Sequence, residues 1–155
     1  MKNAASPSIQ RLLTQPATRV SGLRFAGAMV LGAFLAFAGT SHLSFARKEF
    51  TAQVPSWVPL NADAVVLASG VVEIGLGASL VLWRKRRVPV GLAAAAFFVA
   101  VFPGNVSQYT TGTSAFGLDT DGARLARLFF QPILVLWALW STGAWRAWRN
   151  RANRS

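Results

Sequence analysis

Five polar side chains stand out among those that lie inside long apolar stretches of the sequence, where water cannot solvate them freely. They are His42, Ser69, Glu73, Asn105 and Gln131. Glu73 is the strongest candidate for chemistry, because a carboxyl group at the centre of a membrane span must face the protein interior, find a partner or hold a proton. The pattern therefore indicates a proton-relay or ligand-binding role for Glu73. The alternative is a structural acid that joins two helices by a hydrogen bond.

The other four residues fall at a similar expected depth. His42, Asn105 and Gln131 are each about seven residues, or ~10 Å, outward from the centre of their apolar stretch, and Ser69 is about four residues outward. This layer predicts a small polar pocket that opens toward the outside of the membrane. The alternatives are an interhelical hydrogen-bond clasp and, for His42, an interfacial position. Direct contact between His42 and Glu73 is not expected, since ~10 Å of depth separates them.

Recognisable catalytic sets are missing from the sequence. It has no Ser–His–Asp order, phosphate-binding loop or HExxH motif. With no Cys and one His, it cannot build thiolate metal sites, iron–sulfur clusters or bis-His haem sites. We therefore assign no catalytic or metal-binding residue, and expect neither a covalently bound cofactor nor independent enzymatic activity.

Four apolar stretches must position these residues. Each is close to the ~20 residues that a helix needs to cross ~30 Å of hydrocarbon. They are residues 25–45, 64–83, 88–109 and 128–148. The expected fold is an all-α, four-helix transmembrane bundle formed by residues 25–148.

The basic residues alternate along the chain in groups of four, two, four, two and four, and twelve of the 16 lie at the two ends or at 84–87. The positive-inside rule then places both termini and the 84–87 turn in the cytoplasm. A nucleic-acid partner is not expected, because the charge of +11 is spread between spans rather than gathered on one face. The lipid bilayer of a bacterial inner membrane is the expected surrounding.

The two ends of the chain are short basic segments. Residues 149–155 are expected to be a cytoplasmic tail, and residues 1–24 favour the same interpretation. A mitochondrial presequence and a cleaved signal peptide are open alternatives for the N-terminal segment.

Small residues and prolines add two local expectations. Ala28, Gly32, Ala36 and Thr40 form a stripe that would allow close helix packing or a homodimer. Pro103-Gly104 is expected to kink or unwind the outer end of the third span.

Several short motifs resemble those of the DoxX family of small membrane proteins, over residues 25–145. The two most specific are Val54-Pro55-Ser56-Trp57-Val58-Pro59 and Ser69-Gly70-Val71-Val72-Glu73-Ile74-Gly75-Leu76-Gly77. Phe102-Pro103-Gly104-Asn105 and the Arg127…Gln131 spacing support them. The resemblance implies a four-helix membrane bundle associated with quinone-linked or other membrane redox complexes. It implies no catalytic residue set.

Three functional hypotheses follow. The first is an accessory or quinone-interacting subunit of a membrane oxidoreductase, in which His42, Asn105 and Gln131 bind the quinone, Glu73 holds or relays a proton, and a partner subunit supplies electrons. The second is a small proton-coupled transporter or permeability protein that uses Glu73 and a helix interrupted at Pro103-Gly104. The third is a non-catalytic assembly scaffold.

Overall fold

A computed structural model describes residues 20–152, and all regular structure within them is helical. The helices are α2 (Gly22–Leu43), α3 (Arg47–Thr51), α4 (Ala62–Leu82), the 3-10 turn η1 (Arg84–Arg86), α5 (Arg87–Thr111), α6 (Asp121–Thr142) and α7 (Ala144–Ala152). The predicted all-α class is therefore confirmed. Most of the expected N-terminal tail, residues 1–19, lies outside the described residues, as do residues 153–155.

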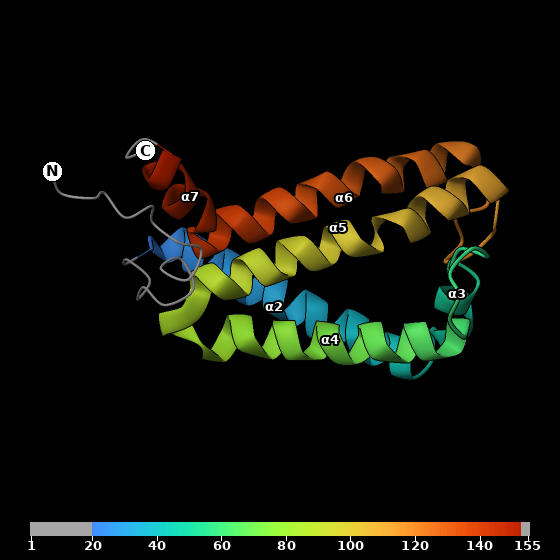
Figure 1. Ribbon diagram of the computed structural model, residues 1–155, viewed down its shortest axis with the longest axis horizontal. Helices are drawn as coiled ribbons and strands as arrows, with labels where there is room; N and C mark the ends of the chain where they lie inside the picture. Colours follow the sequence, from blue (N-terminus) through green and yellow to red (C-terminus); the bar gives the residue numbers. More distant parts are fainter. Residues whose placement is uncertain (1–19, 153–155) are drawn as a thin grey trace, which may run out of the picture.

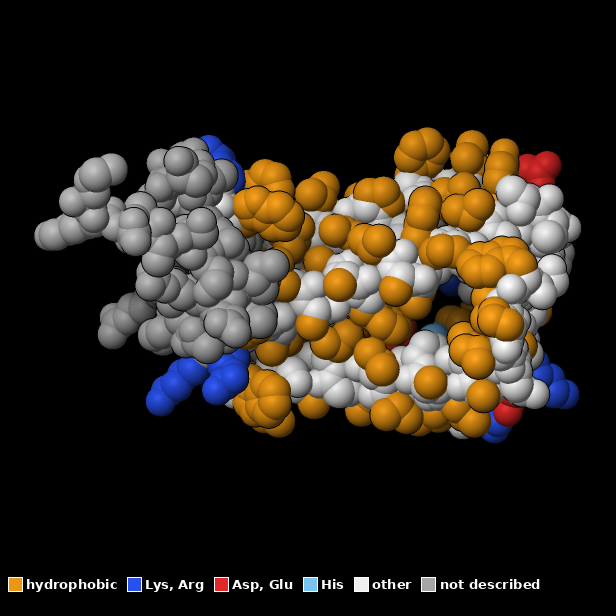
Figure 2. All heavy atoms as spheres, viewed as in Figure 1, with side chains coloured by type: hydrophobic (Ala, Val, Ile, Leu, Met, Phe, Trp, Pro, Cys, Tyr) orange, Lys and Arg blue, Asp and Glu red, His pale blue; other side chains and the backbone are white. Residues whose placement is uncertain are grey.

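Four helical segments are long and apolar enough to cross a membrane, and the third of them joins η1 to α5. They are Gly22–Leu43, Ala62–Leu82, Arg84–Thr111 and Asp121–Thr142. Large apolar side chains point away from the bundle, including Phe37, which is 66% exposed, and Leu136, which is 60% exposed. Figure 2 shows such side chains along the long helices, with charged side chains at the two ends. This exposure suits lipid rather than water, and the chain is a multi-pass integral membrane protein.

The long helices form two antiparallel pairs (Figure 1). Helix α2 packs along α4, and α5 packs along α6. The start of α2 and helix α7 lie at one end of the bundle, while α3 and the 112–120 segment lie at the other. This arrangement agrees with an even number of crossings, whereas the cytoplasmic location of the termini stays a prediction.

Glycines set the spacing between α2 and α4. A Cβ atom added to Gly77 would lie 2.5 Å from the carbonyl oxygen of Gly32, and one added to Gly39 would lie 2.5 Å from the carbonyl oxygen of Gly70. The two backbones thus touch at two points along the interface, a contact that side chains would prevent. Small residues are the means by which helices approach closely in lipid, where apolar side chains gain little by leaving the bilayer.

Only some residues of the predicted small-residue stripe take part in this contact. Ala28 and Gly32 are buried within the bundle, and the backbone of Ala36 faces Gly77. Thr40 is exposed, and its hydroxyl donates to the Ala36 carbonyl of its own helix. Gly32 and Ala36 therefore pack against α4 within one chain, and the homodimer stays a prediction.

The α7 end of the bundle contains the apolar core. Buried side chains from all four spans meet there, among them Leu31 and Leu35 of α2, Leu80 of α4, Ala94 and Phe98 of α5, and Leu134 and Ala138 of α6. Thr142 lies directly against Gly91, where a Cβ atom would overlap the threonine hydroxyl. This packing fixes α6 to α5 at the end opposite α3.

Two details of the span boundaries differ from expectation. The stretch predicted at 128–148 is divided, because α6 begins at Asp121, capped by the Thr120 side chain, and ends where Gly143 takes a positive φ of 78°. Pro103 does not unwind the third span, since α5 continues from Arg87 to Thr111, and the alternative of a kink stays a prediction. A proline removes one hydrogen-bond donor from a helix, and α5 continues on both sides of it.

We expect Gly77→Ala to destabilise the protein by about 1–3 kcal/mol, because the new methyl group must push apart two backbones. Gly75→Ala is the matched control, since a Cβ atom there meets nothing within 4 Å. Thermal unfolding in detergent, followed by tryptophan fluorescence, measures the difference. Equal melting temperatures for the two variants would contradict the close contact of α2 with α4.

Candidate functional site

A cavity of about 480 Å³ occupies the α3 end of the bundle. Its walls come from all four spans, and α3 and the loop segments around residues 53–58 and 116 close its outer side. Figure 2 shows an opening between α4 and α5, with histidine and acidic side-chain atoms visible inside it. The cavity therefore communicates with the lipid-facing side of the protein rather than only with its end.

All five polar residues singled out by the sequence line this one cavity. They are His42, Ser69, Glu73, Asn105 and Gln131. The helix pairs divide them, because three come from α2 and α4 and two come from α5 and α6. That these residues bind a ligand or relay a proton stays a prediction, but their gathering around a single space is a property of the structure.

His42 and Glu73 are direct neighbours, and the expectation that ~10 Å of depth keeps them apart is wrong. The His42 Nδ1 atom lies 3.5 Å from Oε2 of Glu73, and both residues are buried. Each follows a contact glycine by three residues, His42 after Gly39 and Glu73 after Gly70. Side chains lean toward the N-terminus of their own helix, so on antiparallel helices these two lean toward each other. This lean removes the separation that residue counting gives.

Ser69 completes a small cluster on the α2–α4 side. Its hydroxyl lies 3.3 Å from His42 Nδ1 and also donates to the Val66 carbonyl at 3.0 Å. Since a hydroxyl has one hydrogen, Ser69 accepts from the imidazole, and this places the imidazole proton on Nδ1. Among the described residues, Oε2 of Glu73 is buried without a hydrogen-bond partner. The cluster can therefore hold a proton and still offers an unsatisfied carboxyl oxygen.

Asn105 and Gln131 form the expected clasp between α5 and α6. The Asn105 Nδ2 group donates to Gln131 Oε1 at 2.9 Å, and Gln131 Nε2 donates to the Phe98 carbonyl at 2.6 Å. Both residues are buried. Their mutual contact supports a structural role for the pair, at the edge of the cavity.

A second polar network contains residues that sequence reasoning did not select. Arg127 of α6 lines the cavity and donates to Gln108 Oε1 at 3.3 Å and to Gln53 Oε1 at 3.2 Å. Gln53 in turn donates to Gln108 at 3.2 Å. A fourth span counted from residue 128 leaves Arg127 in the outer loop, whereas α6 already begins at Asp121. The sequence signal that identifies Arg127 as a cavity residue is its spacing, because it precedes Gln131 by one helical turn and shares its helix face.

Contacts between α3 and the 112–120 segment close the cavity from above. The Phe116 backbone N–H donates to the Glu49 carboxylate, and the Phe50 and Phe116 rings lie with centroids 4.5 Å apart. Phe116 has a positive φ of 57°, which is uncommon for an aromatic residue and marks a locally strained turn. The Arg127 guanidinium lies over the same ring, 5.1 Å from its centroid.

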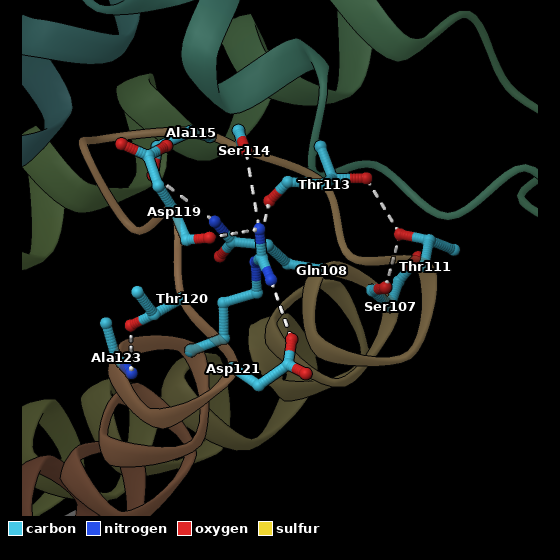
Figure 3. Close-up of polar contacts among 11 residues, drawn as sticks. Ser107, Gln108, Thr111, Thr113, Ser114, Ala115, Asp119, Thr120, Asp121 and Ala123 are labelled. Carbon is cyan, nitrogen blue, oxygen red and sulfur yellow. Dashed lines mark hydrogen bonds and ion pairs between the residues drawn. The ribbon is translucent and has the colours of Figure 1, made fainter.

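Two arginines, each paired with a carboxylate, stabilise α3 and the 112–120 segment over the cavity. Arg124 pairs with Asp121 at 2.8 Å and donates to Thr113, Ser114 and Asp119 of the loop (Figure 3). Arg47 of α3 forms a two-bond contact with Asp63 in the first turn of α4. That hydrogen bonding raises the pKa of the Arg47 guanidinium above its ordinary value. The outer side of the cavity is thus closed by folded, paired structure.

Comparison with known families adds one finding. Residues 31–142 match a family described as "Domain of unknown function (DUF8561)". The chain belongs to this family. The DUF8561 match contains every cavity residue described above and excludes α7. No curated protein and no solved structure showed significant similarity to the chain.

We expect the Asn105–Gln131 clasp of the DUF8561 domain to contribute measurable coupling. In a double-mutant cycle of Asn105→Ala and Gln131→Ala, the coupling free energy should be about 0.5–2 kcal/mol, as for other hydrogen bonds between membrane helices. Ser79→Ala is the control partner, because its hydroxyl bonds to the Gly75 carbonyl of its own helix. Unfolding in detergent measures each variant. Additive effects of Asn105→Ala and Gln131→Ala would refute the clasp.

Proposed function

We propose that the protein binds a quinone-type molecule from the bilayer, as an accessory subunit of a membrane redox complex. The observation that carries this proposal is the cavity between α4 and α5, which opens toward lipid, has mostly apolar walls and ends in polar groups. A molecule dissolved in the membrane can enter such a space without crossing water. Its volume of about 480 Å³ is in the usual range for sites that hold small organic ligands.

The polar groups suit a quinone ring. Its carbonyl oxygens require hydrogen-bond donors. The Asn105 amide nitrogen lines the cavity and has a second hydrogen besides the one donated to Gln131, and the His42 imidazole has a donor for the ring when both of its nitrogens carry a proton. Reduction of a quinone takes up protons, and the neighbouring Glu73 carboxyl can hold one beside His42. Gln131 then positions Asn105 through the 2.9 Å hydrogen bond and does not itself need to contact the ligand.

Electrons must come from a second protein in this proposal. The sequence has no cysteine and one histidine, so it lacks the ligand sets that hold iron–sulfur clusters or bis-His haem. The resemblance of its motifs to the DoxX family supports the same assignment, and the distribution of basic residues favours a bacterial inner membrane with both termini in the cytoplasm.

The two alternatives gain unequal support. The transporter hypothesis depended on an interrupted third span, and α5 is a continuous helix through Pro103. The scaffold hypothesis gains support at Asn105 and Gln131, which bond to each other. It does not account for a lipid-facing opening or for the buried Glu73 oxygen without a hydrogen-bond partner.

A substitution at the opening tests the proposal. Ala100 of α5 lines the cavity and is exposed, so Ala100→Trp should obstruct the opening and abolish quinone enrichment. Ala96→Trp is the matched control, one turn away on the same exposed face but outside the cavity. Both variants are extracted in native-membrane nanodiscs, and quinone per protein is compared with quinone in the bulk membrane. No enrichment with the unmodified chain would refute the proposal.

Glu73→Gln separates proton chemistry from structure. The amide keeps the size and hydrogen bonding of the side chain but cannot hold a proton. We expect the variant to fold at least as stably as the parent chain while quinone affinity loses its dependence on pH. Titrations of a short-chain benzoquinone into nanodiscs at several pH values measure this. An unchanged pH profile would contradict a proton-holding role for Glu73.

A further inference from the structure

Arg127 differs from the paired arginines at the same end of the bundle. Arg47 and Arg124 each contact a carboxylate, whereas the Arg127 guanidinium has no carboxylate within 4 Å among the described residues. Its two hydrogen bonds go to the neutral amide oxygens of Gln53 and Gln108. A guanidinium has five N–H groups, so three of them lack an acceptor among the described residues.

The position of Arg127 makes this incomplete pairing chemically useful. The residue lines the cavity, and one face of its guanidinium lies over the Phe116 ring. The two glutamines hold the guanidinium from the side of α5 and the loop after α3, and neither brings a negative charge. In the low dielectric of a membrane site, a cation without a counterion strongly favours an anionic oxygen over a neutral one.

We propose that Arg127 is a specificity-determining residue that selects ligands with an anionic oxygen on the head group. This inference rests on the proposed function, since it specifies the chemistry of the molecule in the same cavity. The ligand class is a lipophilic quinone or related ring compound whose acidic hydroxyl is ionised at neutral pH. The acidic group would accept hydrogen bonds from Arg127 while the ring occupies the apolar part of the cavity.

Two probes of similar size separate charge from shape. The anionic probe is 2-hydroxy-1,4-naphthoquinone, which is ionised at neutral pH, and the neutral probe is 2-methyl-1,4-naphthoquinone. Equilibrium dialysis against the protein in nanodiscs, with empty nanodiscs subtracted, gives the affinity for each. We expect the parent chain to bind the anionic probe more tightly than the neutral one.

Arg127→Gln should weaken binding of the anionic probe about tenfold or more, the effect of a hydrogen bond to a charged group, and leave the neutral probe within about twofold. Arg127→Lys keeps the charge and should retain a reduced preference for the anion. Lys48→Gln is the control, because it removes one exposed positive charge at the same end outside the cavity. Thermal unfolding of each variant shows that the fold is kept.

The outcomes separate this inference from the proposed function. Binding of the neutral probe with no preference for the anion, or equal losses of both probes in Arg127→Gln, overturns the role of Arg127 alone. An equal loss of anion binding in Lys48→Gln also overturns it, because surface charge would then explain the preference. Failure of both probes to bind the parent chain overturns the quinone proposal and this inference together.

Discussion

The contact between the backbones of α2 and α4 is the constraint on which the site depends. Gly39 meets Gly70, and Gly32 meets Gly77, so the two helix axes come closer than side chains would permit. His42 and Glu73 follow the outer glycine pair by three residues and lean toward each other across it. With a larger residue at either glycine, the imidazole and the carboxyl would separate, and the polar cluster would lose its geometry.

The cavity exists because the two helix pairs join at one end only. Between the cavity and the α7 end, Leu35, Leu80, Phe98 and Leu134 fill the centre of the bundle. At the α3 end, polar side chains are satisfied mainly within each pair, as Ser69 and His42 are on one side and Asn105 and Gln131 on the other. In lipid, little hydrophobic gain drives the pairs together there. Folded loops bridge the pairs instead, and they leave the space beneath open to the side.

The sequence was sufficient for the fold class and for the residues that gather in the cavity, but not for their distances. Apolar runs of span length and the alternating basic residues determine the number of helices. Counting residues gives the depth of a Cα atom and ignores side-chain direction, which is why the contact of His42 with Glu73 was missed. Arg127 was missed because hydropathy cannot separate the first polar turns of α6 from a loop. The continuity of α5 through Pro103 was not predicted, because a proline in the sequence signals a kink or a break but does not decide which, if either, occurs.

The polar groups of the cavity are satisfied unequally in the structure. The Asn105–Gln131 pair is held together without a ligand, because Asn105 donates to Gln131 and Gln131 donates to the Phe98 carbonyl. Glu73 retains a buried oxygen without a hydrogen-bond partner, and Arg127 lacks a carboxylate among the described residues. A neutral amide at either position would join helices without placing an ionisable group in lipid. The carboxyl and the guanidinium therefore cost stability that helix packing does not require. Contact with a molecule that enters between α4 and α5 would offset that cost.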